Sequence, residues 1–396
     1  MQLLRASWIV PVSGPLLRDG VVAVEGGRVS FVGPSSSADA PAGTLRDLGR
    51  GVLMPGLVNA HCHLELSALW GRVEAGGGFT AWVRELLDER ARVPAAQARE
   101  ATAEAIRRVE ASGTVAVGDV SNALDHLDLL VASSLEAVVF FELIGWDPAQ
   151  AGATLEKADA RLAAVGGEGP APNLAVRLAA HAPHSVSGEL FRRLVARGGP
   201  AALHLAESPD ETRFLASGDG AWRAFLAERG GEVAFAPPGV SPVAYVAGLG
   251  VLRPGLVAAH CVQVDAADRR RLAAAGVAVA VCPRSNRALG VGIPPVPELI
   301  ADGVLVALGS DSLASAPSLD LLDDAVALHR EFPSLDAKVV VQMATQNGAR
   351  ALGLAELGTL APGKRAALAF AAAAGAIEDP LEFLLSGDAR LERVRL

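Results

Sequence analysis

The sequence predicts an α/β fold, a (β/α)8 TIM barrel flanked by short β segments at both ends of the chain. Short apolar runs recur through the middle of the chain, and each run ends in polar residues. An amphipathic stretch rich in Ala, Leu and Arg follows each run. Continuous apolar strands that alternate with helices indicate a parallel sheet that is buried on both faces.

The first 54 residues predict small antiparallel β structure. Val21–Val24 and Val29–Val32 are two short β-rich runs around Gly26 and Gly27, which is a hairpin pattern. The other end of the chain is similar, because Ala366–Phe370 is extended in pattern and the last residues alternate between apolar and polar.

Eight strand candidates lie between these ends, and helical segments such as Ala98–Ala111 alternate with them. The strand candidates are Leu57–Ala60, Thr114–Val120, Ala137–Leu143, Leu174–Ala180, Ala201–Leu205, Leu256–Ala259, Val277–Val281 and Val304–Leu308. Eight such units over roughly 300 residues fit a barrel with insertions. A doubly wound sheet is the alternative, but His61-Cys62-His63 stands where its glycine-rich fingerprint would follow the first strand. The segment around Asp147–Pro172 is either a lid or an ordinary connection.

Composition restricts the class of protein. Hydrophobic residues make up 51% of the chain, and the net charge of −9 disfavours a nucleic-acid partner, which needs a basic face. The longest apolar run, Ala366–Ile377, is shorter than the ~20 residues of a membrane-spanning helix. Pro11 and Gly14 interrupt any signal peptide, and three cysteines make a disulfide framework a poor fit. We therefore expect a cytoplasmic protein with a small-molecule substrate; a homodimer is compatible with the sequence.

Most of the histidines lie at the carboxyl ends of predicted strands. The strand-end residues are His61, His63, His181, His184, His204 and His260, and Asp311 follows the last strand. In a barrel these strand ends converge on the face where active sites lie. His61 and His63 share one side of their strand, because side chains alternate with a period of two.

A metal site is the first function that this pattern predicts. Three imidazoles from His61, His63 and His204 with the carboxylate of Asp311 suit a divalent cation, with Zn²⁺ expected and Fe²⁺ as the alternative. Coincidental core histidines are the other interpretation. None of the three lysines lies at a strand end, so a lysine-bridged pair of metals is not available. We expect one metal ion.

Glu207 is the predicted catalytic partner, since it lies in the loop just beyond His204. A metal ion lets its bound water ionise near neutral pH and attack an electrophilic carbon, and a carboxyl of raised pKa can protonate the leaving group. Alternatively Glu207 is only the neighbour of a helix start at Ser208–Glu211. His260 either orients the water and the leaving group, or serves as a fifth ligand or structural hydrogen-bonding group.

Several further residues are candidate substrate contacts. His181 is placed to hydrogen-bond a ring nitrogen or a ribose hydroxyl, or else supports the metal ligands. The tryptophans could stack on an aromatic substrate, and the arginines after the seventh strand could pair with a carboxylate. The predicted contacts are His181, His184, Trp70, Trp82, Trp146, Arg284, Arg287 and Ser312.

At this point the sequence resembles a known family, the amidohydrolase superfamily, and within it the deaminase and chlorohydrolase branch. The matching segments are Pro55–His63 (PGLVNAHCH), His181–Ser185 (HAPHS), His204–Glu207 (HLAE), His260, Cys282–Asn286 (CPRSN), Gly309–Asp311 (GSD) and Leu357–Lys364 (LGTLAPGK). Two positions depart from the family pattern: His184 stands where the family has Tyr, and Ala367 stands where it has Asp.

The resemblance implies roles for these residues. His61, His63, His204 and Asp311 would bind one metal, Asp311 would accept a proton from the bound water, Glu207 would shuttle protons and His260 would lie beside the water. It also implies a distorted barrel over residues 55–355 and a small composite β-sandwich made from residues 1–54 and 356–396. The His184 departure changes the substrate wall, so specificity does not carry over from members with Tyr.

The function implied is a hydrolytic deaminase, in which metal-bound hydroxide attacks an amino-substituted heteroaromatic ring and ammonia leaves. The sequence is similar to deaminases of 6-amino-6-deoxyfutalosine, an adenine nucleoside with an aromatic carboxylate, so we expect that substrate and a role in menaquinone biosynthesis. The alternatives are guanine or S-adenosylhomocysteine-type deamination and triazine dechlorination. A non-catalytic barrel that binds partners is the alternative from a different class.

Overall fold

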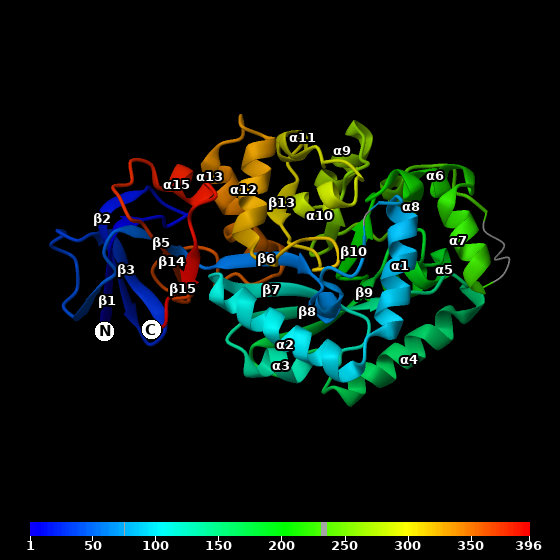
Figure 1. Cartoon of the computed structure of the whole chain (residues 1–396), viewed down its shortest axis with the longest axis horizontal. Helices are drawn as coiled ribbons and strands as arrows, with labels where there is room; N and C mark the ends of the chain where they lie inside the picture. Colours follow the sequence, from blue (N-terminus) through cyan, green and yellow to red (C-terminus); the bar gives the residue numbers. More distant parts are fainter. Residues whose placement is uncertain (75, 231–235) are drawn as a thin grey trace.

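The computed structural model describes residues 1–74, 76–230 and 236–396. Figure 1 shows a small sheet domain that carries both termini and, beside it, a larger α/β domain. The predicted fold class, a distorted barrel with a small domain from both ends of the chain, is confirmed.

The small domain is one hydrogen-bonded sheet with the order β15-β14-β5-β1-β2-β3, and β4 pairs with β1. Its strands are β1 Gln2–Ile9, β2 Leu17–Glu25, β3 Arg28–Pro34, β4 Thr44–Asp47, β5 Gly51–Pro55, β14 Leu368–Ala372 and β15 Leu391–Arg393. The predicted hairpin joins β2 to β3, and both of its turn glycines have the positive φ that such two-residue turns require. Strand β14 pairs antiparallel with β5, so the end of the chain completes the sheet that the beginning starts.

Two parallel four-stranded sheets form the larger domain. The first holds β6 Leu57–Cys62, β7 Thr114–Ser121, β8 Glu136–Leu143 and β9 Leu174–Ala180. The second holds β10 Ala202–Leu205, β11 Val257–His260, β12 Ala278–Val281 and β13 Leu305–Leu308. Each of these strands overlaps one of the predicted apolar runs. Strand β7 is buried along its whole length, as expected for a parallel strand covered on both faces.

The two sheets meet at two seams. At one seam the backbone N–H of His204 donates to His181 O at 2.7 Å, and Ala201 N–H donates to Leu178 O at 2.8 Å. At the other, Asp311 N–H donates to His61 O at 3.1 Å beside a parallel bridge between Cys62 and Asp311. The strands therefore run around a barrel whose regular pairing is interrupted at these seams, and predicted site residues lie at both.

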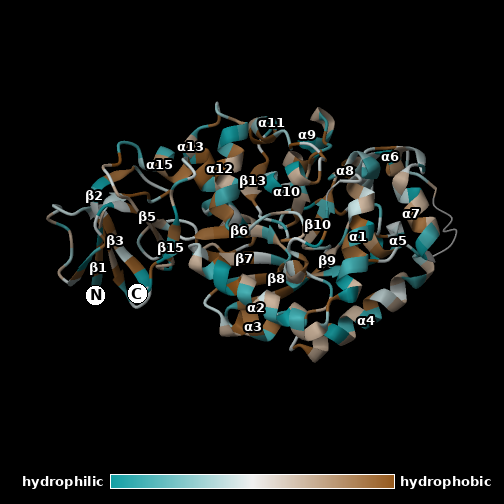
Figure 2. Cartoon of the chain, viewed as in Figure 1, coloured by the Kyte–Doolittle hydropathy of each residue, from teal (hydrophilic) through white to brown (hydrophobic). Residues whose placement is uncertain are grey.

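Helices cover the barrel from outside (Figure 1). They are η1 Leu64–Leu69, α1 Phe79–Arg92, α2 Ala95–Ala111, α3 Leu127–Ala132, η2 Pro148–Gln150, α4 Ala151–Ala164, α5 Gly188–Ala196, α6 Pro209–Ser217, α7 Ala221–Gly230, α8 Pro242–Gly248, α9 Ala266–Ala274, α10 Pro283–Ala288, α11 Val296–Ala301, α12 Leu321–Glu331, α13 Ala337–Met343, α14 Gln346–Ala351 and α15 Pro380–Leu385. In Figure 2 these helices mix hydrophilic and hydrophobic residues, as helices with one buried face do.

The segment around Asp147–Pro172 is an ordinary connection rather than a lid. It contains α4, whose Leu155, Ala158 and Leu162 are buried in the main hydrophobic core. Within the described ranges no helix has the length and apolar character needed to cross a membrane.

Candidate active site

The site residues lie where strands end, and several of these ends have unusual backbone geometry. Ala206, His260 and Asp311 have φ values of 52°, 70° and 59°, in the left-handed region that non-glycine residues rarely adopt. Such a conformation costs about 1–3 kcal/mol and persists where surrounding contacts enforce it. Here it turns the chain sharply after β10, β11 and β13, and the side chains that follow the strands face the barrel mouth.

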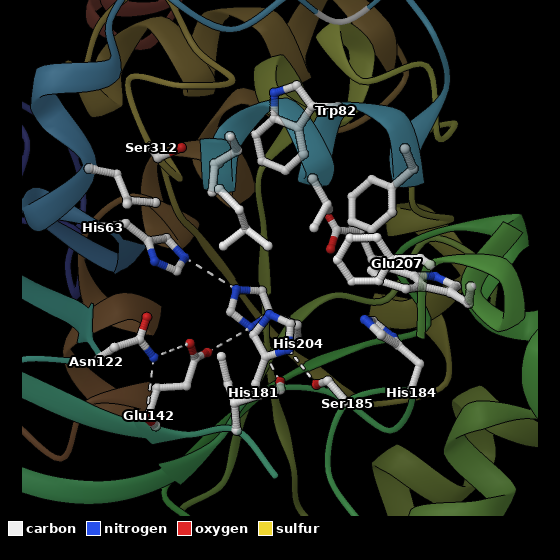
Figure 3. A pocket seen from close by; sticks show the side chains of 18 of the residues that line it. His63, Trp82, Asn122, Glu142, His181, His184, Ser185, His204, Glu207 and Ser312 are labelled. Carbon is white, nitrogen blue, oxygen red and sulfur yellow. Dashed lines mark hydrogen bonds and ion pairs between the residues drawn. The ribbon is translucent and has the colours of Figure 1, made fainter. Parts of the chain in front are cut away.

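The predicted metal ligands converge (Figure 3 shows His63 and His204). His63 Nε2 lies 3.2 Å from His204 Nε2, and Asp311 Oδ1 lies 3.6 Å from His63 Nε2 and 3.8 Å from His61 Nε2. The buried His61 Nε2 has no hydrogen-bond partner among the described residues. Three ring nitrogens and one carboxylate oxygen at these spacings fit one divalent cation, which would give the orphaned His61 nitrogen a partner.

Neighbouring side chains orient these predicted ligands. Ser285 Oγ and Ser315 Oγ donate to Asp311 Oδ2 at 2.5 and 3.0 Å, which leaves Oδ1 facing the histidines. Glu142 Oε1 lies 3.2 Å from His204 Nδ1, so that Nε2 is the ring nitrogen directed at the site. Orientation of a ligating imidazole by a carboxylate on its other nitrogen is a common feature of metal sites.

Burial and charge set the protonation of the cluster. Burial lowers the pKa of His61 well below its ordinary value and that of His260 to about 3, so both rings are neutral. Burial also acts to lower the pKa of His204, but the hydrogen bond and charge of Glu142 outweigh it and raise that pKa to about 9. The pKa of Asp311 is lowered despite burial, because the surrounding histidines and Ser285 favour its charged form.

Glu207 has the environment of a proton donor. Burial raises the pKa of its carboxyl well above the ordinary value, and Asp311 and Glu211 add to the effect against the opposing His204. Its Oε1 lies 3.5 Å from His260 Nε2. Glu207 lines the cavity, and it also precedes a helix start, because Ser208 Oγ caps α6.

A cavity of about 380 Å³ opens above the cluster. The floor of the cavity is polar. Five predicted substrate contacts line the cavity: Trp82, Trp146, His181, His184 and Ser312. Its wall is mostly apolar, formed by residues such as Phe79, Val83, Leu86, Leu87, Ile144, Phe225 and Leu226. The volume falls in the usual range of small-molecule sites, ~300–1,000 Å³.

Three predicted substrate contacts lie outside this cavity, which corrects those predictions. Trp70, at the end of η1, is 56% exposed and does not line the cavity. Arg284 instead pairs with the buried Asp324 at 2.7 Å and joins α10 to α12. Arg287 pairs with Glu331 on the surface at 2.5 Å.

The structure also adds lining residues that the sequence analysis missed. Glu142 lies near the carboxyl end of β8, and Asn122 lies just beyond that of β7. The criterion that selected the histidines, a polar residue at the carboxyl end of a strand, could therefore have found both. Trp222 and Arg229 come from α7, and Arg90 comes from α1. No local sequence signal marks those three residues, because tertiary packing brings their helices over the barrel mouth.

The barrel and the cluster at its strand ends define the centre of a metal-dependent hydrolase. A model of the Amidohydrolase family matches residues 52–388, and the chain belongs to this family. Membership confirms the predicted class of a hydrolase that acts on carbon–nitrogen bonds.

Several known proteins are similar to this chain over most of its length. A 5-methylthioadenosine/S-adenosylhomocysteine deaminase of Moorella thermoacetica is 33% identical over 387 residues, covering 92% of this chain and 84% of that protein. An aminodeoxyfutalosine deaminase of Deinococcus radiodurans is 34% identical over 316 residues, covering 76% of this chain and 73% of that protein. The solved structure of an adenosine deaminase from Xanthomonas campestris with bound zinc is 25% identical, with a TM-score of 0.81 and coverage of 98% and 89%.

Proposed function

We propose that this protein is a metal-dependent deaminase that hydrolyses the exocyclic amine of an adenine nucleoside. The observation that carries the proposal is the buried Glu207 beside His260, next to three histidines and Asp311 at the floor of a nucleoside-sized cavity. The named activities of the Moorella, Deinococcus and Xanthomonas proteins support the same reaction class.

Each residue has a role that its geometry supports. A divalent cation bound by His61, His63, His204 and Asp311 would supply the Lewis acidity that lets water ionise near neutral pH. Asp311 Oδ1 is free to accept the proton of the attacking water, because two serines occupy Oδ2. Glu207 then protonates the departing amine, which leaves as ammonia. His260 Nε2 lies 3.5 Å from Glu207 Oε1, so one water beside the pair could contact and be oriented by both groups.

The substrate that we propose is 6-amino-6-deoxyfutalosine, which would place the reaction in menaquinone biosynthesis. The similarity to the Deinococcus aminodeoxyfutalosine deaminase supports this choice. The aromatic wall suits an aromatic substituent, and Arg90 and Arg229 line the cavity as cations for a carboxylate. These two arginines replace Arg284 and Arg287 in that proposed role.

A second candidate is 5′-methylthioadenosine or S-adenosylhomocysteine. The apolar wall formed by residues such as Leu87 and Leu226 favours 5′-methylthioadenosine of these two, because its methylthio group would be buried there without needing a polar partner. The Moorella relative supports it as well. For the cation we propose Zn²⁺, supported by the grouping of His61, His63 and His204 and by Asp311, which lies within 4 Å of two of these rings.

Ammonia release over a panel of substrates tests the proposal. The panel contains 6-amino-6-deoxyfutalosine, 5′-methylthioadenosine, S-adenosylhomocysteine, adenosine, guanine and a chlorotriazine, all with zinc-loaded protein. We expect turnover of adenine nucleosides and a loss of about 10²–10⁴-fold in kcat for Glu207→Gln, the range for a missing general acid. The control Glu228→Gln removes a surface carboxylate that pairs with Arg84 and should leave kcat unchanged. No ammonia from any adenine nucleoside would contradict the proposed function.

A further inference from the structure

Two polar side chains in the cavity wall lack hydrogen-bond partners. Both ring nitrogens of His184 and the indole nitrogen of Trp222 are buried and unpaired among the described residues. The side chains are only 4% and 3% exposed, and both line the cavity above the metal cluster. Buried polar groups in folded proteins are nearly always paired, so three orphaned nitrogens at one place point to a missing ligand group.

Their place in the cavity indicates which part of a substrate they meet. The ring of His181 lies 5.1 Å from His204, and the ring of His184 lies 5.7 Å from His181. Trp222 then stacks on His184 at 4.0 Å with an interplanar angle of 24°. Figure 3 shows His184 on the far side of His181 from Glu142 and His63. The pair therefore lies beyond His181 from the His204 ring, and we infer that it faces a part of the substrate away from the metal-side atoms.

The surroundings make this pair distinctive. The rings of Phe79 and Phe225 lie at steep angles to Trp222, with centroids 6.1 and 5.4 Å away, and neither side chain carries a nitrogen or oxygen that could accept its N–H. Burial lowers the pKa of His184 well below its ordinary value, so its imidazole is neutral and offers one donor and one acceptor. With the indole N–H, the pair presents two donors in a wall that is mostly apolar.

We propose that His184 and Trp222 together recognise an oxygen acceptor, a carbonyl or carboxylate, on the nucleoside substituent remote from the reacting amine. This inference rests on the proposed function and deepens it, since it separates two adenine nucleosides that share a base and a sugar. A substituent with such an oxygen satisfies the buried donors, whereas a methylthio substituent leaves them unpaired. A site built to hydrogen-bond a group discriminates strongly against an analogue that lacks it.

The test compares two substrates across matched variants of the zinc-loaded protein. The substrates are 6-amino-6-deoxyfutalosine, which carries the oxygen, and 5′-methylthioadenosine, which lacks it. His184→Phe and Trp222→Phe keep a stacked ring and remove the polar nitrogens. Trp8→Phe is the control, because its indole donates to Ile377 O in the small domain, away from the cavity. For each variant, kcat/KM and the dissociation constant from calorimetry are measured together.

We expect each cavity variant to lose about ten-fold or more in both quantities for the oxygen-bearing nucleoside, the effect of one lost hydrogen bond. For the methylthio nucleoside, kcat/KM and the dissociation constant should each change by less than about two-fold, because no hydrogen bond to this substrate is lost. Equal losses for both substrates would show a merely structural role and overturn the inference, as would no change for either. If the wild-type protein turned over neither nucleoside, the proposed function would fail, and the dissociation constants would still decide the inference.

Discussion

At the scale of single residues, Glu142 links the cavity to His204, a proposed metal ligand. Its Oε1 faces His204 Nδ1 at 3.2 Å, and its Oε2 accepts from Asn122 Nδ2 at 2.9 Å. Removing the charge should loosen the imidazole without deleting a ligand. We predict that Glu142→Gln weakens zinc binding by about 10–100-fold, the usual effect of losing such a carboxylate.

Chelator competition measures this change directly. Glu136→Gln is the matched control, because Glu136 lies at the opposite end of β8 and pairs with Arg365. Unaltered zinc affinity in Glu142→Gln would show that His204 is held by packing alone.

The protonation of His204 predicts a pH dependence of metal binding. Because Glu142 raises the pKa of His204 to about 9, the ring carries a proton below that pH in the cation-free protein. A cation must displace this proton, so apparent zinc affinity should rise by about ten-fold per pH unit up to about pH 9. Chelator competition at about pH 7 and about pH 8, with proton release followed in dilute buffer, checks the slope. Equal zinc affinity at the two pH values would contradict the protonated state assigned to His204.

At the scale of elements, Arg284 joins two helices instead of binding substrate. It pairs with Asp324 at 2.7 Å and with Asp323 at 3.1 Å, which ties α10 to α12. Arg284→Met leaves the buried Asp324 without its partner, and loss of one member of a buried pair costs about 3–5 kcal/mol. We therefore predict a lower free energy of unfolding and an unchanged KM. Chemical denaturation and steady-state kinetics measure the two quantities, and a raised KM with full stability would restore the substrate interpretation.

The elements also show which features were predictable from sequence. The barrel strands were predictable because a buried parallel strand is a continuous apolar run, and polar residues at its end reach a common face. The cavity residues that helices supply were not predictable, because residues far apart in sequence meet only after the helices pack. Trp70 follows β6 closely yet points outward, whereas Trp222 lies on α7 and reaches the cavity. Proximity to a strand end therefore identified side chains that the fold brings together, such as His63 and His204, but it did not separate Trp82 and Trp146, which line the cavity, from Trp70, which does not.

At the scale of the whole molecule, barrel closure and the metal cluster depend on the same residues. His204 N–H bonds His181 O at one seam, and Asp311 N–H bonds His61 O at the other. A cation shared by β6, β10 and the end of β13 should therefore stabilise the barrel as a unit. At about a thousand-fold excess over Kd, zinc should add about 4 kcal/mol to the free energy of unfolding.

Thermal denaturation with and without zinc measures this stabilisation. We predict a higher Tm for the wild-type protein and no zinc response for His61→Ala, which removes one ligand at a seam. An equal rise in Tm in the wild-type protein and in His61→Ala would show that zinc binds at a site that does not include His61.

We propose that one cation, held by His61, His63, His204 and Asp311, makes this barrel a deaminase. The most direct measurement strips the protein with a chelator, adds zinc stepwise and follows ammonia release from an adenine nucleoside. We predict no activity in the stripped protein and full recovery at one equivalent of zinc, with no recovery in His61→Ala. Ammonia release by the stripped protein, or recovery only at two equivalents, would contradict the account.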